Sequence, residues 1–133
     1  MVIGGDAGND KPKPPRSSST SEQVEALAAG ADILVHSTIH PAMGPDKDSG
    51  FPPPIYFRQS TASDLGALAK RAGVKNLMFT HLIPPVGAPR QGPYPIPGGA
   101  LTKEDYEKSA RDAGFEGKVV VGTDLASVML TAE

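Results

Sequence analysis

One unit recurs three times along this chain: a capping residue, an amphipathic helix closed by glycine, and a short aliphatic strand. A Ser or Thr opens each helix and Gly closes it, as expected for helix caps. The helices are predicted over residues 19–30, 61–73 and 102–114, and the strands over residues 33–35, 77–79 and 119–121. Residues 1–5 (MVIGG) look like the end of a fourth strand. Helices that alternate with buried strands indicate an α/β fold, a sheet covered by helices.

The apolar residues of the first two helices fall at helical spacing and predict which side faces the core. In the first helix these residues are Val24, Leu27 and Ala28, and in the second they are Leu65, Leu68 and Ala69. The first helix begins with a predicted capping box from Ser19 to Glu22. Each strand is a continuous aliphatic triplet, which is typical of strands covered on both faces.

Proline and glycine are concentrated between these units. The chain has 14 Pro and 15 Gly, gathered mainly in residues 11–16 (KPKPPR), 51–54 (FPPP) and 84–99. Such stretches cannot form helix or central strand, so we expect long, stiff loops. Long loops in compact domains are often functional.

Composition limits the possible partners. A formal charge of −2 and a pI near 5.9 give no electrostatic case for nucleic acid or an anionic membrane. We therefore expect a cytoplasmic protein with a small-molecule substrate, no nucleic acid and no membrane. There are no cysteines, which leaves His, Asp and Glu as the strong metal ligands.

Polar residues follow the four apolar runs: Asp6, His36, His81 and Asp124. In layered α/β folds, ligands bind beyond the carboxyl ends of strands. His40 lies in the loop just after His36 and is an alternative ligand with it. The pattern is that of a metal site with an incomplete ligand set, although polar residues at strand ends are also common where a chain simply turns.

Residues 1–130 resemble the second half of the metallo-β-lactamase superfamily, especially its ribonuclease Z-like and arylsulfatase-like branches. The most specific match is QSTASDLGALAKRAGVKNLMFTHLIPP, followed by VIGGDAG, ADILVH and KVVVGTDLASVML. The resemblance implies half of an αβ/βα sandwich, with residues 1–133 as a single domain. It also implies two zinc ions per complete site, with Asp6 bridging the metals and His81 as the terminal histidine ligand. A metal-activated hydroxide would then attack an ester or amide.

The chain departs from the family pattern in three places. The His-x-His-x-Asp-His cluster that precedes Asp6 in the family is absent. Gln59 stands where ribonuclease Z-like members carry His, and Ser37 stands where they carry Glu. An amide does not titrate in the useful range, so the proton relay is missing, which argues against tRNA processing.

Three further expectations follow. A non-catalytic module that keeps the fold for assembly is the rival to a metal-dependent hydrolase. The segment GGDAGND is a weaker indication of a phosphate loop. Because Met1 falls inside a predicted strand, we expect that the chain is an incomplete family fold whose uncovered inner face drives it into a homo-oligomer.

Overall fold

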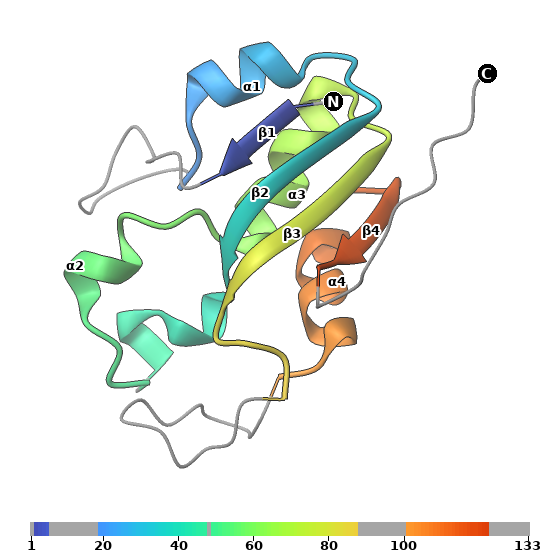
Figure 1. Ribbon diagram of the computed structural model, residues 1–133. Coiled ribbons are helices and arrows are strands. Elements are labelled where there is room, and N and C mark those ends of the chain that lie inside the picture. The colour runs from blue at the N-terminus through green and yellow to red at the C-terminus, as the bar shows by residue number, and fades with distance from the viewer. Residues whose placement is uncertain (1, 6–18, 48, 88–100, 123–133) are drawn as a thin grey trace.

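The computed structural model of the chain describes residues 2–5, 19–47, 49–87 and 101–122. They form a sheet of four parallel strands in the order β1-β2-β3-β4 (Figure 1). The strands are β1 (Val2–Gly5), β2 (Ile33–Ile39), β3 (Asn76–Ile83) and β4 (Lys118–Val121). Each predicted aliphatic run lies in one of these strands, and the α/β class is confirmed.

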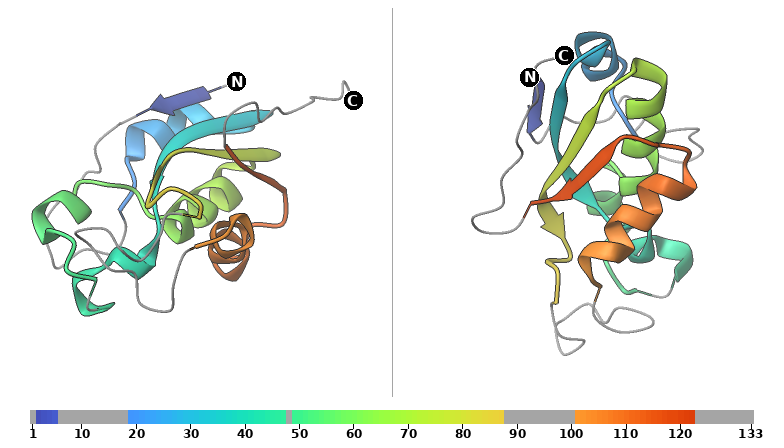
Figure 2. Two further views of the ribbon diagram at one scale, coloured as in Figure 1. Left: turned by 60° about the horizontal axis from the view of Figure 1, so that its bottom comes forward. Right: turned by 90° about the vertical axis from the view of Figure 1, so that its right-hand side faces the viewer.

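Three helices connect the strands: α1 (Glu22–Ala28), α3 (Ala62–Ala72) and α4 (Lys103–Asp112). Spatial order follows chain order, so crossovers of the usual right hand place all three helices on the same face of the sheet. Figure 2 shows this single helical layer. Within the described residues no helix lies on the opposite face, so the expectation of strands covered on both faces is not met there.

The connection from β2 to α3 lies beyond the carboxyl ends of the strands (Figure 1). It contains two short 3-10 helices, η1 (Pro41–Met43) and η2 (Pro45–Lys47), and the one-turn helix α2 (Pro53–Tyr56). The proline-rich 51–54 segment, predicted to be a loop, thus begins a short helix, because proline is tolerated in a first helical turn. No helix in the described ranges is long and apolar enough to cross a membrane.

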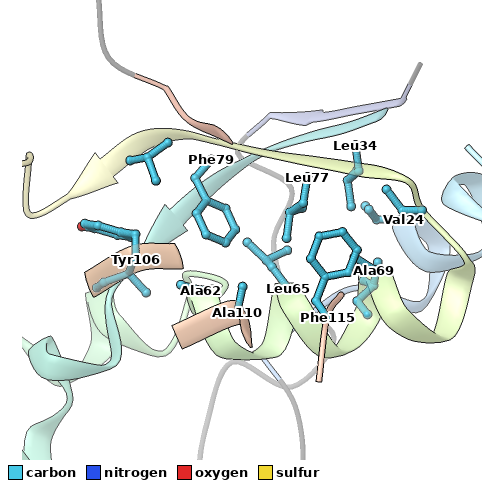
Figure 3. Packing of buried hydrophobic residues seen from close by; sticks show 14 of the residues in the cluster. Val24, Leu34, Ala62, Leu65, Ala69, Leu77, Phe79, Tyr106, Ala110 and Phe115 are labelled. Atoms are coloured by element: carbon cyan, nitrogen blue, oxygen red, sulfur yellow. The ribbon is translucent and has the colours of Figure 1, made fainter. Parts of the chain in front are cut away.

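The core fills the space between the sheet and its helical layer (Figure 3). Leu77 and Phe79 point from β3 towards the residues of α3 and α4, among them Leu65 and Tyr106, while Leu34 points into the core beside Val24 of α1. Leu34, Leu65, Leu77, Phe79 and Tyr106 are fully buried. Helices α3 and α4 touch almost backbone to backbone. A Cβ atom placed on Gly66 would lie 2.7 Å from the Cα and carbonyl oxygen of Ala110.

The start of α1 differs from the prediction. The cap is Ser21, whose hydroxyl accepts the backbone N–H of Val24, and the predicted box from Ser19 to Glu22 is wrong. Along the helix, Val24 and Ala28 are buried as predicted, but Leu27 is 72% exposed. One short helix with seven residues offers only a narrow stripe to the sheet, and Leu27 lies outside that stripe.

Ser19 instead anchors the start of α3. Its backbone N–H donates to the Asp64 carboxylate (2.9 Å), and its hydroxyl oxygen accepts the backbone N–H of Thr61 (2.9 Å). The Ser60 hydroxyl donates to the Ser19 carbonyl (2.8 Å), while the Thr61 side chain caps the backbone N–H of Asp64 (3.1 Å). Two segments more than forty residues apart therefore share one helix cap.

Candidate functional site

The carboxyl edge of the sheet is irregular on both sides of β2. Between β1 and β2 the register shifts between Ile3 and Gly5. Between β2 and β3 it shifts after Ser37, so that Thr38 pairs with Leu82 and His81 is the extra residue. Such bulges bend a strand end and re-aim its side chains, and they are over-represented next to active sites.

His81 occupies the bulge of β3 in an unusual conformation. Its φ is +44°, the left-handed region that non-glycine residues rarely adopt. Its side chain is exposed at the carboxyl edge. A left-handed residue other than glycine costs about 1 kcal/mol, and such strain clusters at functional sites. Among the predicted ligands in the described residues, His81 alone combines exposure with this geometry.

His36 is buried in β2 and is not open to solvent. Its Nδ1 lies 2.7 Å from the carbonyl oxygen of Ser37, which fixes the ring. The ring lies over Gly4 of β1, where it occupies the space that a Cβ atom would need. Gly4 is thus a positioning residue that sequence reasoning missed, although a Gly-Gly pair at the end of a strand is a signal for a bulge or a close approach.

His40 is a structural residue, so its interpretation as a replacement metal ligand is not supported. The backbone N–H of Ala42 donates to its Nδ1 (3.0 Å), and its Nε2 lies 3.3 Å from the carbonyl oxygen of Asp105. The ring packs edge-on against Tyr106, with 5.1 Å between ring centroids. Both nitrogens are therefore engaged with backbone groups.

We expect this burial to make the protein sensitive to acid. Burial lowers the pKa of His40 below its ordinary value, and the Asp105 carbonyl and carboxylate offset this only in part. The stability that neutral His40 contributes is fully present above about pH 6.5, its pKa in the unfolded state. This contribution is lost as the pH falls towards the lower pKa of His40 in the folded state. In urea unfolding, the difference in free energy of unfolding between the wild type and His40→Asn, which keeps an acceptor for Ala42, should be constant above about pH 6.5 and should shrink below it, because only the wild type loses stability there. A wild type that loses no more stability than the variant would contradict the assignment.

Of the two predicted metal ligands, His81 lies in β3 and Asp6 follows the last residue of β1 in the sequence. Asp6 and Asp124 lie outside the described residues, but Gly5, the residue before Asp6, ends β1 beside β2. β1 and β3 flank β2, so their axes are about 10 Å apart at the same edge. In the described ranges no group of three potential ligands gathers, so His81 fits as one member of a zinc site but the described residues do not close one.

Ser37 and Gln59 stand where ribonuclease Z-like proteins carry the Glu and His of the expected proton relay. Both residues lie at the carboxyl end of the sheet. Ser37 is buried in β2, next to the bulge, and Gln59 is partly buried just after α2. The backbone N–H of Gln59 donates to the Tyr56 carbonyl, which holds the turn into Ser60. Neither side chain supplies a group that exchanges a proton near neutral pH.

The helix-backed parallel sheet is consistent with one half of an αβ/βα sandwich, and its carboxyl edge carries His81. No family model matches the chain. It is 31% identical over 107 residues to ribonuclease Z of Mycobacterium tuberculosis H37Rv, covering 80% of this chain and 34% of that protein. It is 35% identical over 81 residues to ribonuclease Z of Pseudomonas putida KT2440, covering 61% and 20%.

The chain is similar to proteins named ribonuclease Z, which are members of the metallo-β-lactamase superfamily, and this similarity is consistent with the superfamily that the sequence resembles. The relatives that it resembles are named ribonuclease Z, and the chain spans between 20% and 42% of their length. The expected hydrolase class is thereby supported.

The expectation of a small-molecule substrate and no nucleic acid is wrong, because these relatives are by name ribonucleases. That expectation was based on the net charge of the whole chain. A sum over the whole chain does not report the local potential of a site, which decides whether a polyanion binds there. Metal-activated water attacks phosphodiesters as well as carboxylic esters, so the ligands alone do not separate these substrates.

Proposed function

We propose that this chain forms the His81-bearing layer of a metal-dependent ribonuclease that hydrolyses phosphodiester bonds in RNA. Zinc is the proposed metal, with Asp6 and His81 as two of its ligands. The observation that carries the proposal is His81 itself, an exposed imidazole in the left-handed conformation on a bulge at the carboxyl edge. The location is proposed to be cytoplasmic, where an enzyme that acts on cellular RNA meets its substrate.

The chemistry of the two ligand types supports this assignment. A carboxylate has two oxygens and spans two cations, whereas a neutral imidazole offers one nitrogen to a borderline-soft ion. Bound zinc would lower the pKa of a water molecule and so supply a hydroxide nucleophile. The bulge aims the His81 ring away from the packed core, and the buried His36 ring on Gly4 holds the neighbouring strand end in place.

The rival function is a non-catalytic module that keeps the fold for assembly. Ser37 and Gln59 favour it, since neither replaces the acidic and imidazole groups of the proton relay. So does the lack of a three-ligand cluster among the residues that the structure places. The two functions differ in one measurable property, because only the ribonuclease needs metal bound at Asp6 and His81.

Zinc content after dialysis, measured by elemental analysis, tests the proposal directly. Because Asp6 and His81 are an incomplete ligand set, the dialysis buffer contains zinc, and we expect the wild type to take up more zinc than Asp6→Ala and His81→Gly do. Asp46→Ala, which removes an exposed carboxylate in η2, is the matched control and should take up as much as the wild type. Cleavage of a labelled RNA oligonucleotide should follow zinc content and stop on chelation. A folded wild type without zinc, or unchanged zinc in both ligand variants, would favour the non-catalytic module.

His81→Gly also separates ligand loss from unfolding. Glycine adopts positive φ at no steric cost, so this variant should be more stable than the wild type by about 0.5–1 kcal/mol. Chemical denaturation of the metal-free proteins measures the difference. Loss of zinc together with a gain in stability is the signature of strain kept for function. A clear loss of stability would instead mean that the His81 side chain has a structural role.

A further inference from the structure

The bulge in β3 turns His81 away from the buried side of the sheet. Leu77 and Phe79 of the same strand point into the core (Figure 3). An unbroken alternation of side chains would send His81 the same way, opposite the buried Thr38. The register shift instead pairs Thr38 with Leu82, which packs against the core, and leaves His81 exposed. The outward position of the imidazole therefore depends on the register of β3.

Tyr106 of α4 contacts β3 and its continuation on both sides of this bulge. Before His81 in the chain, the Tyr106 ring lies 6.4 Å from the ring of Phe79, measured between centroids. After His81, the Tyr106 hydroxyl donates to the carbonyl oxygen of Pro84 at 2.5 Å. Tyr106 is fully buried, and its ring also packs edge-on against His40. The tightly packed ring therefore holds the hydroxyl in one place.

These two contacts fix the length of chain between Phe79 and Pro84. A strand rises about 3.3 Å per residue, and the extra residue of a bulge shortens the path by about one such step. If β3 slipped by one residue and lost its bulge, the Pro84 carbonyl would move away from the Tyr106 hydroxyl by that step. Backbone bonds, such as that from the His40 N–H to the Ile83 carbonyl (2.8 Å), can reform with a neighbouring carbonyl after a slip. The buried Tyr106 hydroxyl would instead lose its acceptor, which is costly.

We propose that Tyr106 is a positioning residue for His81: its hydrogen bond to Pro84 keeps the bulge in β3 and so keeps the imidazole at the carboxyl edge. This role rests on the proposed function, in which His81 binds zinc. The left-handed conformation of His81 is costly, and strained residues persist only where the surrounding structure over-determines them. Tyr106 supplies that constraint from α4, outside the strands whose ends carry the proposed ligands.

Nuclear magnetic resonance of the isotope-labelled whole chain, recorded with a chelator, tests this proposal without metal or RNA. In the wild type, His81 should show the strong nuclear Overhauser effect between its amide and α protons that a positive φ produces. In Tyr106→Phe, the ratio of outward to inward His81 should fall about tenfold, the effect of one lost hydrogen bond. Relaxation dispersion measures the inward conformer where it is the minor state.

Tyr56→Phe is the matched control for this measurement. It also removes the hydroxyl of a buried tyrosine, but in α2, and should leave the ratio of outward to inward His81 unchanged. Failure of the ribonuclease function would appear separately, as absent cleavage of RNA with zinc present, and would not alter this ratio.

Circular dichroism shows whether both variants fold. If Tyr106→Phe does not, proton contacts in the wild type decide the matter, because the Tyr106 ring must then show contacts to both Phe79 and Pro84. A wild type without the contact between Tyr106 and Pro84 would overturn the proposal. So would an unchanged ratio of outward to inward His81 in folded Tyr106→Phe, or an equal change in Tyr56→Phe.

Discussion

Replacing Tyr106 by alanine is expected to lower the free energy of unfolding by about 4 kcal/mol, the range for a large aromatic removed from a packed core. Tyr106 is fully buried between the sheet and α4. Its ring lies 6.4 Å from the ring of Phe79 and 5.1 Å from that of His40, measured between centroids. Its hydroxyl donates to the Pro84 carbonyl at 2.5 Å. Truncation removes all of these contacts at once and leaves a cavity.

Tyr106→Phe separates the hydrogen bond from the packing. It keeps the ring and leaves the Pro84 carbonyl without this donor, which should cost about 1–2 kcal/mol. Urea unfolding followed by circular dichroism gives both values under the same conditions. If the alanine variant is no less stable than the phenylalanine variant, the ring does not hold α4 to the sheet as its contacts indicate.

Gly66→Val is expected to cost about 3 kcal/mol, at the upper end for overpacking. Even the first carbon of a side chain at this position would lie 2.7 Å from backbone atoms of Ala110. Those atoms cannot rotate away, so α3 and α4 must separate, and the core between them and the sheet opens. Glycine and valine differ little in helix propensity on this scale, so the effect reports the helix contact.

Ala67→Val is the matched control for this contact. It places the same side chain one residue further along α3, where the position is only partly buried. The control should lose about 0.5 kcal/mol through helix propensity alone. Equal losses in the two variants, measured by thermal or urea unfolding, would show that α4 does not approach Gly66 closely.

Much of the fold was predictable because its signals are local. The helix predicted over residues 61–73 is observed as α3, with Thr61 as its N-cap and Gly73 in the left-handed conformation at its end. The capping box from Thr102 to Asp105 begins α4, and both of its hydrogen bonds are present. The strands were predicted from short runs of aliphatic residues alone. Each of these features depends on residues within a few positions of one another.

The candidate site was predictable in part. That His81 follows an aliphatic strand is readable from the chain, and the parallel topology puts it at the same edge as the end of β1. Its bulge and positive φ were not readable, because they arise from the register between β2 and β3. His40 follows His36 by four residues, yet one ring is held by α4 and the other by β1. Spacing along the chain does not reveal which partners surround a side chain.

By itself, the order of residues determined the α/β class, the caps of α3 and α4, the glycine stops and the strand positions, because backbone propensity and periodic burial act over short distances. Only the tertiary structure decided that Ser19 anchors α3, that Leu27 faces outward, and that α1, α3 and α4 all pack on the same face of the sheet. These features depend on hydrogen bonds and packing between segments far apart in the chain. Such contacts form only when the layers assemble, and a local pattern does not contain them.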